Sequence, residues 1–180
     1  PALLHRFRIE RQTLAALDHP NIIRLLDGGH TADGNPYLVT EYIQGLTIDA
    51  YCRQSVSCLN DRLRLFEKVC AAVVCAHQNL VIHGDIKPSN ILVGEDGVPK
   101  LIDFGAATLL NPELGSGTTE PSEQRLRLFT PEFAAPEQLR GERSTVASDV
   151  YALGLLLHVL LTDRLPRWQR PAASEESAVR

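Results

Sequence analysis

Two short segments of this chain set its fold and its chemistry: VIHGDIKPSNILV at residues 81–93 and LIDFG at residues 101–105. Each begins with an apolar run that is typical of a strand, and each run is followed by a polar loop. Asp85 comes after the first run, Asn90 lies five positions later, and Asp103 ends the second run. The sequence therefore brings two carboxylates and an amide to the ends of two strands.

Phosphoryl transfer is the chemistry that uses such a set of side chains. The reaction needs an acceptor hydroxyl in line with the phosphate, and metal ions that neutralise the phosphate oxygens. One carboxylate can orient the hydroxyl and accept its proton. A second carboxylate and an amide oxygen can hold Mg²⁺, which prefers oxygen ligands. Asp85, Asp103 and Asn90 fit these three roles.

Together the two segments resemble the catalytic loop H-R-D-x-K-x-x-N and the metal-binding motif D-F-G of protein kinases. The resemblance implies that Asp85 is the catalytic base and that Lys87 stabilises charge on the moving phosphoryl group. It also implies that Asn90 and Asp103 hold the metal ion beside the nucleotide. A polar hairpin with incidental acids is the plain alternative. Both motifs, correctly spaced and each behind an apolar run, argue against it.

The same resemblance gives structural roles to two aromatic residues and marks one departure. His83 is expected to pack under Phe104 and not to act as a base, because no Ser or Cys in a nucleophile-like context accompanies it. The family's usual Arg before the catalytic Asp is Gly84 here. An Arg at that position adds a buried cation that is often neutralised by a phosphate on the activation segment. Gly84 carries no such charge.

We therefore predict that activity depends only weakly on phosphorylation of the activation segment, which the resemblance places at residues 106–130. Replacing the Ser and Thr residues of that loop in the full-length protein should leave phosphoryl transfer undiminished. The transfer rate, measured beside that of the unchanged protein, checks this expectation. Complete loss of activity in the substituted protein would refute it.

The first part of the chain resembles a kinase C-helix and the residues after it. Leucine and phenylalanine recur at helical spacing over residues 2–17, and Asp18-His19-Pro20-Asn21 ends the pattern. The sequence F-x-x-E-R-x-x-L-x-x-L-x-H-P-N-I implies that Glu10 pairs with the lysine of strand 3 in the nucleotide site. The plain alternative is a solvated Glu beside an Arg.

The next segments read as a hairpin that leads into the hinge between two lobes. Apolar and β-branched residues predict strands at 22–26 and 37–42, with a turn-rich stretch at 28–36. In kinases the second strand ends beside the adenine pocket. The resemblance then implies that Thr40 is the gatekeeper, that Glu41 and Ile43 offer backbone groups to the adenine, and that Leu92 forms part of its floor.

Further elements follow from periodicity and from turn residues. We predict helices over 47–54, with Thr47 as N-cap, over 59–79 and over 148–161, and strands at 91–93 and 98–102 around the turn at 94–97. The helix over 59–79 is expected to bury a broad stripe: Leu63, Phe66, Val69, Cys70, Val73, Val74 and His77.

The sequence TPEFAAPE at residues 130–137 resembles the substrate-docking loop and A-P-E motif that close the activation segment. The resemblance implies that Thr130 bonds the catalytic Asp and Lys, as in kinases that act on Ser and Thr. Glu137 would normally pair with an Arg of a later helix and is expected to lack that partner here. Asp149, at the start of the last predicted helix, is expected to accept backbone hydrogen bonds from the catalytic loop.

Composition narrows the classes of partner. The chain has 180 residues and a net charge of −4, so no broad basic surface for nucleic acid is implied. No apolar run approaches the ~20 residues of a membrane span, so no membrane contact is expected from this segment. The four cysteines form no C-x-x-C pair. A cytoplasmic setting is expected, with Cys70 and Cys75 buried, and an anchor elsewhere in the full-length protein stays open.

The expected fold is α+β, a partial two-lobe kinase fold with a mostly helical large lobe. Residues 1–43 are expected to form part of the small lobe, residues 44–168 part of the large lobe, and residues 169–180 a disordered tail. The chain has no Met and begins with Pro1. Its lysines, Lys68, Lys87 and Lys100, all follow the expected C-helix, and no Gly-rich stretch comes before it, so this chain is expected to lack the first part of the nucleotide-binding lobe. We expect a fragment that is inactive alone.

The function that the resemblance implies is a serine/threonine protein kinase that uses ATP and Mg²⁺, with Mn²⁺ as an alternative, and acts on protein substrates. Two alternatives stay open. A small-molecule phosphotransferase of the aminoglycoside kinase type shares the H-G-D and later Asn, although Lys87 and the A-P-E segment argue against it. A pseudokinase or scaffold fragment is the alternative without catalysis.

Overall fold

The computed structural model of this chain describes residues 11, 13–33, 35–56, 58–104, 107–109 and 130–166. Glu10, residues 110–129 of the predicted activation segment and the predicted tail at 169–180 lie outside these residues. The backbone is helical at residue 11 and at 13–16, within the predicted helix over 2–17.

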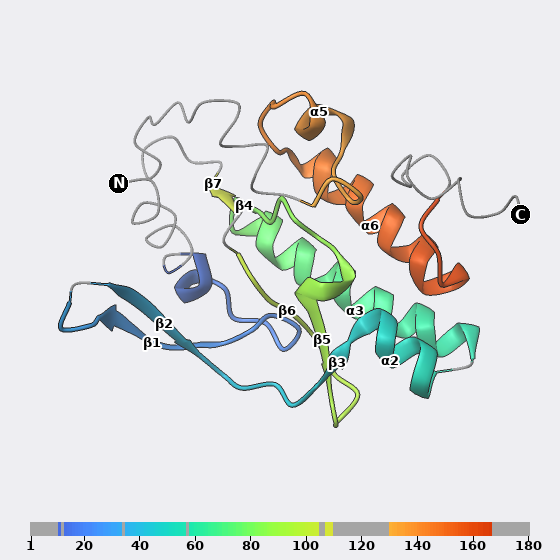
Figure 1. Cartoon of the computed structure of the whole chain (residues 1–180), viewed down its shortest axis with the longest axis horizontal. Helices are drawn as coiled ribbons and strands as arrows, with labels where there is room; N and C mark the ends of the chain where they lie inside the picture. Colours follow the sequence, from blue (N-terminus) through green and yellow to red (C-terminus); the bar gives the residue numbers. More distant parts are fainter. Residues whose placement is uncertain are drawn as a thin grey trace, which may run out of the picture.

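Strands and helices both contribute to the fold, and Figure 1 shows their arrangement. The first strands form a hairpin that extends away from the helices, which lie together on the other side. In chain order the elements are β1 (Leu25–His30), β2 (Pro36–Thr40), β3 (Gly45–Thr47), α2 (Ile48–Ser55), α3 (Leu59–Gln78), β4 (Val81–Ile82), the 3₁₀ turn η1 (Pro88–Asn90), β5 (Ile91–Gly94), β6 (Pro99–Leu101), β7 (Thr108–Leu109), α5 (Pro136–Leu139) and α6 (Val146–Thr162).

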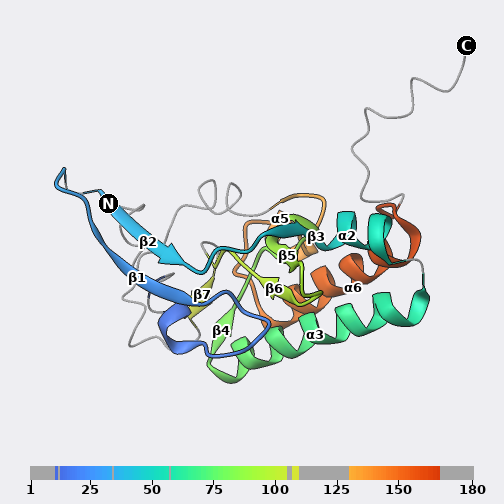
Figure 2. The same cartoon turned by 90° about the horizontal axis from the view of Figure 1, so that it is seen from below.

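The hairpin of β1 and β2 is antiparallel, as predicted, but its first strand is not where the sequence placed it. The strand runs through Gly28 and Gly29, which lie opposite Leu38 and Tyr37, and it begins at Leu25 and not at Ile22. Glycine is compatible with both turn and strand, so pairing with β2 decides its conformation here. Figure 2 shows the hairpin projecting from the remainder of the molecule.

The chain segment before β1 is attached to the central sheet, which has the strand order β3-β5-β6. Ile22 forms a parallel bridge with Leu101 in β6. The amide of Ile23 donates to the carbonyl of Leu101 at 2.9 Å, and the amide of Leu101 donates to the carbonyl of Asn21 at 2.8 Å. These bonds place the hairpin next to the strand that leads into Asp103.

Strand β3 lies so close to β5 that only glycine fits at its first residue. A Cβ on Gly45 would lie 2.0 Å from the carbonyl oxygen of Val93. We predict that Gly45→Ala lowers the free energy of unfolding by about 3 kcal/mol, the upper end of the cost of overpacking, because the two backbones must separate. Urea titration measures the change.

A matched control for that substitution is Gly154→Ala in α6. Apart from its chain neighbours and the backbone of its own helix, no heavy atom lies within 4 Å of a Cβ built on Gly154. Alanine should therefore raise the stability there by about 1 kcal/mol through helix propensity alone. Equal effects of the two substitutions would contradict the steric account of Gly45.

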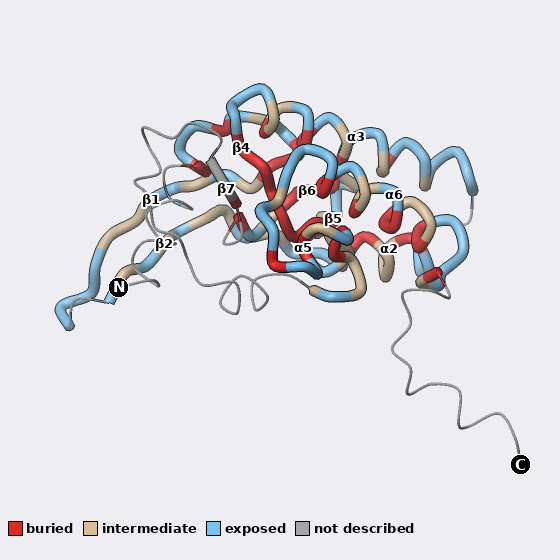
Figure 3. Tube along the Cα trace, turned by 90° about the horizontal axis from the view of Figure 1, so that it is seen from above, coloured by how far each residue is buried: buried red, intermediate tan, exposed pale blue. Residues whose placement is uncertain are grey.

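The core lies where α3 and α6 meet the short strands, as the buried segments in Figure 3 show. The buried face of α3 is narrower than the predicted stripe and is made of partly different residues. Leu63 and Val74 are 39% and 52% exposed, and Cys70 is half-buried, so the broad stripe was wrong at these positions. Small Ala72 and Ala76 allow neighbouring elements to approach closely. The residues that α3 buries are Leu65, Val69, Ala72, Val73 and Ala76.

One arginine joins the three helices around this core. The Arg62 guanidinium donates from Nη2 to the carbonyl of Cys52 at 3.2 Å, and from Nη1 to that of Leu160 at 2.6 Å. Its Nε also donates to the carbonyl of Val56 at 3.0 Å. These bonds attach the C-terminal ends of α2 and α6 to α3, at the carbonyls that are least well satisfied within a helix.

The last helix, α6, is capped at both ends and extends slightly beyond the predicted range. Thr145 Oγ1 accepts from the amide of Ser148 at 3.3 Å, and Ser148 Oγ accepts from that of Thr145 at 2.9 Å. The helix ends at Asp163, whose φ of 56° is left-handed. Although α6 is strongly apolar, none of the helices in the described ranges has the length and apolar content needed to cross a membrane.

The cysteines are only partly in the environment that the sequence predicted. Cys75, like Cys70, is half-buried, whereas Cys52 is the one that is buried and Cys58 is exposed. All four carry free thiols. Burial raises the pKa of the Cys52 and Cys70 thiols, so these two are poor nucleophiles near neutral pH.

Candidate active site

The loop that carries Asp85 runs from β4 to η1 and is held in place by Asp149 of α6. Asp149, 1% exposed, accepts hydrogen bonds from the amides of His83 at 3.0 Å and Gly84 at 2.8 Å. His77 Nε2 lies 2.8 Å from the same carboxylate. Gly84 has a φ of 79°, a left-handed conformation that glycine adopts without strain. Asp149 thus fixes the backbone just before Asp85.

The strand that leads into Asp103 is attached to this loop through Ile102. The amide of Ile102 donates to the carbonyl of Asn90 at 2.9 Å, and His83 Nε2 lies 3.2 Å from the carbonyl of Ile102. The rings of His83 and Phe104, both fully buried, have centroids 4.8 Å apart. These contacts place Asp103 directly beside the loop that contains Asp85 and Asn90.

The Asp85 carboxylate is the centre of a group of hydrogen bonds. Its Oδ1 accepts from the amide of Thr130 at 3.0 Å, and its Oδ2 lies 2.6 Å from Lys87 Nζ. Asn90 Nδ2 donates to the same Oδ2 at 3.2 Å and to the Asp85 carbonyl at 2.9 Å. Lys87 Nζ also donates to Thr130 Oγ1 at 2.6 Å. Lys87, Asn90 and Thr130, the first residue of the predicted docking segment, therefore meet at one carboxylate.

Asp103 has a backbone conformation that is uncommon for residues other than glycine. Its φ is 60°, in the left-handed region, and its side chain is exposed, whereas Phe104 is buried. Such a conformation costs of order 1–3 kcal/mol and is found preferentially at functional sites. The buried ring of Phe104 and the bonds of Ile102 hold the backbone on both sides of Asp103.

The donor set at this position fits a hard divalent cation. Both hydrogen bonds of the Asn90 side chain use its amide nitrogen, so the amide oxygen is the atom available to a metal ion. Asp103 supplies a carboxylate. In the described part of the chain, no three His, Cys, Asp or Glu side chains form a metal cluster. Mg²⁺ is typically held by one or two carboxylates together with phosphates and water, so this site needs no such cluster.

The residues predicted to face the adenine lie where β2 ends and the chain crosses to β3. Thr40 is half-buried and pairs with Leu25. The Glu41 side chain accepts from Lys100 Nζ at 2.7 Å and from the Arg24 amide at 2.8 Å. Burial alone raises the pKa of Glu41, but these hydrogen bonds outweigh it and lower the pKa below its usual value. The Lys100 contact, which the sequence analysis missed, attaches this crossing to β6.

The two other predicted adenine contacts lie on either side of that crossing. Ile43 is half-buried just before β3, and Leu92 is half-buried in β5, where it lies opposite Thr47 of β3 and Lys100 of β6. The central sheet therefore carries Leu92 close to the segment that contains Ile43.

Glu137, which was expected to lack an arginine partner from a later helix, bonds a serine of α6. Ser148 Oγ donates to Glu137 Oε1 at 2.6 Å. Ser148 belongs to the capping box of α6, so its hydroxyl is held in place near α5. The short serine side chain reaches Glu137 because α5 and the start of α6 lie next to each other.

The sequence analysis also missed Gln138, the next residue of α5. It is 2% exposed, and its Nε2 donates to the carbonyl of Gly84 at 2.7 Å. Its Oε1 accepts from the amide of Ala135 at 2.9 Å. The available signal was Gln at the third position of a helix that begins with Pro136, the spacing at which its side chain reaches back to the N-cap amide.

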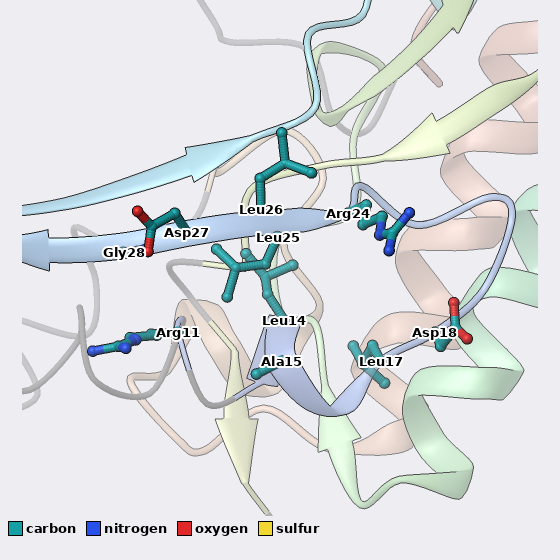
Figure 4. A pocket seen from close by; sticks show the side chains of 10 residues that line it. All are labelled: Arg11, Leu14, Ala15, Leu17, Asp18, Arg24, Leu25, Leu26, Asp27 and Gly28. Carbon is teal, nitrogen blue, oxygen red and sulfur yellow. The ribbon is translucent and has the colours of Figure 1, made fainter.

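A cavity of about 460 Å³ lies elsewhere, between the residues 11–18 and β1, as Figure 4 shows. Arg11, Asp18, Arg24 and Asp27 contribute its charged groups, and Leu14, Leu17 and Leu25 contribute apolar surface. It shares no residue with the group of hydrogen bonds around Asp85. We do not assign it to the candidate active site.

Comparison with known proteins identifies the family of this chain. Residues 3–180 match the family model described as the protein kinase domain. The chain is 39% identical over 164 residues to the serine/threonine-protein kinase PrkC of Bacillus subtilis, covering 91% of this chain and 24% of that protein. It is 35% identical to the probable serine/threonine-protein kinase PknB of Lactococcus lactis, over 89% of this chain and 25% of the relative.

A third relative, the serine/threonine-protein kinase PknB of Mycolicibacterium smegmatis, is 35% identical over 92% of this chain and 27% of its own length. The chain thus spans about a quarter of the length of these curated relatives. The matches confirm the predicted resemblance and the α+β kinase fold class.

Proposed function

Because this chain belongs to the protein kinase domain family, we propose that it is part of a serine/threonine protein kinase, which transfers the γ-phosphate of ATP to Ser and Thr hydroxyls of proteins. The observation that carries the proposal is the convergence of Lys87, Asn90 and Thr130 on the Asp85 carboxylate. It joins a base, a cation, a metal-binding amide and the acceptor-docking segment.

In this proposal the Asp85 carboxylate orients the acceptor hydroxyl and accepts its proton. Thr130 and Asn90 hold the carboxylate in place through one hydrogen bond to each oxygen. Lys87, within 2.6 Å of both Asp85 and Thr130, is positioned to stabilise negative charge on the transferring group. His83, Phe104 and Asp149 serve to fix the loop and do not take part in the chemistry.

The family uses ATP and a divalent metal ion, and we propose Mg²⁺, with Mn²⁺ as an alternative. When bound, the metal ion neutralises phosphate charge. Asn90 and Asp103 would hold it, in accord with their oxygen donors. Thr40, the backbone of Glu41 and Ile43, and Leu92 would surround the adenine. Glu10, outside the described residues, would orient a lysine that is not among the residues of this chain.

Selection of protein acceptors is proposed from the place of Thr130. This residue begins the segment 130–135 and bonds both Asp85 and Lys87, so the segment lies against the reacting groups. A small-molecule phosphotransferase has no need of such a segment. Glu137 and Ser148 fix the end of the same region against α6.

The test uses the full-length protein with radiolabelled ATP and Mg²⁺, a generic basic protein as one acceptor and an aminoglycoside as the other. We expect label on Ser and Thr of the protein and none on the aminoglycoside. Label on the aminoglycoside would favour the small-molecule enzyme. Absence of transfer to either acceptor would favour a scaffold.

The arrangement of the whole protein is also a proposal. We assign residues 1–43 to the small lobe and 44–168 to the large lobe, since the crossing from β2 to β3 is the connection between the hairpin and the helices. We place the site in the cytoplasm, where ATP is abundant, and leave any membrane anchor to parts of the protein outside this chain.

A further inference from the structure

We propose that Gln138 is a positioning residue that holds the catalytic loop and the acceptor-docking segment in register with each other. The inference rests on the proposed function, because it concerns the acceptor side of the same site. Its basis is the pair of hydrogen bonds by which one buried side chain joins Gly84, just before Asp85, to Ala135, at the end of the segment 130–135.

The peptide unit between Gly84 and Asp85 is hydrogen-bonded at both of its polar atoms. Its carbonyl accepts from Gln138 Nε2 at 2.7 Å, and its amide donates to His83 Nδ1 at 3.2 Å. The amide of Gly84 is held by Asp149. The orientation of the backbone that carries Asp85 is therefore set by α5 from one side and by α6 from the other.

The segment 130–135 forms a turn whose end is buried. Its turn is closed by the amide of Phe133, which donates to the carbonyl of Thr130 at 2.9 Å. Ala134 and Ala135 are buried, at 2% and 0% exposure. Gln138 Oε1 accepts from the amide of Ala135, so the glutamine holds the far end of a compact unit whose near end is Thr130.

These contacts close a ring. Thr130 bonds the Asp85 carboxylate, the turn connects Thr130 to Ala135, and Gln138 returns from Ala135 to the carbonyl of Gly84. Without Gln138 the docking segment keeps its bonds to the catalytic loop through Thr130 and its bond to α6 through Glu137, but its far end loses the direct bond to the carbonyl of Gly84. An acceptor hydroxyl bound by that segment then loses its alignment with Asp85, and misplacement by ~1 Å can cost about 10²-fold in rate.

A role in positioning acceptors differs from a role in stability because water needs no docking segment. ATP hydrolysis and transfer to protein use the same nucleotide site, so an unfolded fraction lowers both rates equally. The ratio of the two rates is therefore independent of the amount of folded protein. Loss of acceptor alignment lowers the transfer rate and leaves hydrolysis in place.

The experiment measures both rates in the full-length protein and in two variants. Gln138→Met removes both hydrogen bonds without adding a charge, and Gln138→Glu keeps an acceptor for Ala135 but cannot donate to Gly84. For each we expect kcat for a protein acceptor to fall about 10- to 100-fold, while ATP hydrolysis and KM for ATP change by less than about twofold.

Ser144→Ala is the matched control. It removes the third hydrogen bond of Gln138, from Nε2 to Ser144 Oγ at 3.0 Å, and leaves both bonds of the ring. Its ratio of transfer to hydrolysis should equal that of the unchanged protein. A ratio unchanged in both Gln138 variants, or changed equally by Ser144→Ala, would overturn the inference. No transfer to protein by the unchanged enzyme would overturn the proposed function itself.

Discussion

Replacing Asp85 with Asn in the full-length protein is expected to reduce phosphoryl transfer to protein by about 10²- to 10⁴-fold, the usual contribution of a general base. Asn has the same shape but cannot accept the hydroxyl proton. Its amide would also place a donor near Lys87 or the Thr130 amide, where the structure has donors already. The rate is measured with saturating ATP, so that the loss reports on the chemical step.

The control for this substitution is Asp61→Asn. Asp61 lies in the first turn of α3, and its side chain is 55% exposed beside Arg64. The same chemical change there should leave the transfer rate within about twofold of that of the unchanged protein, because surface ion pairs contribute little. An Asp85→Asn protein with the rate of the control would remove Asp85 from the reaction.

The second large effect, a loss of stability, is expected for Asp149→Ala. The Asp149 carboxylate is 1% exposed and accepts from two buried backbone amides, those of His83 and Gly84. Alanine leaves both amides and the nearby His77 ring without their acceptor, and each unsatisfied buried donor costs about 1–3 kcal/mol. We therefore expect the free energy of unfolding to fall by about 3–5 kcal/mol, measured by urea titration.

Asp61→Ala again supplies the comparison, with an expected change of less than about 1 kcal/mol. The activity of folded Asp149→Ala protein should fall as well. The backbone at Gly84 and Asp85 then keeps its hydrogen bond to Gln138 but loses the one to Asp149. A loss of stability no larger than that of Asp61→Ala would show that the two amides find other acceptors. Asp149 would then not be the residue that fixes the catalytic loop.

Elements with strong local signals could be predicted from the sequence. The helix over 59–79 was predicted one residue longer than α3, Leu59–Gln78, and the Asp-Gly turn between β5 and β6 was located correctly. Both have periodic or turn residues that determine their conformation locally. The convergence of Lys87, Asn90 and Thr130 on Asp85 followed only from the resemblance, since no local pattern relates residue 130 to residue 85.

The features that were missed depend on contacts between distant segments. Strand β3 has only the residues Gly45–Thr47 and exists because β5 lies beside it. Gly28 and Gly29 carry no side chain that would indicate a strand, so only pairing with β2 reveals one. The prediction of a broad apolar stripe on α3 was wrong at Leu63 and Val74. Periodicity identifies an apolar face of a helix, but it does not tell how much of that face the neighbouring elements cover.

Two contacts of α5 were missed because the residue types involved have several possible roles. Ser148 bonds Glu137, but from the sequence its hydroxyl could equally have been a simple helix cap. Gln138 could have been an exposed helical residue by its type alone. Its burial follows from the approach of α5 to the loop at Gly84, which only the fold determines.

The most direct test of the central claim is an experimental structure of the full-length protein with Mg²⁺ and a non-hydrolysable ATP analogue. We expect a metal ion with Asn90 Oδ1 and an Asp103 carboxylate oxygen among its ligands. We also expect the terminal phosphate on the side of the metal that faces Asp85 and Lys87. A metal–nucleotide complex bound away from these residues, or an Asp103 side chain directed away from Asn90, would contradict the central claim.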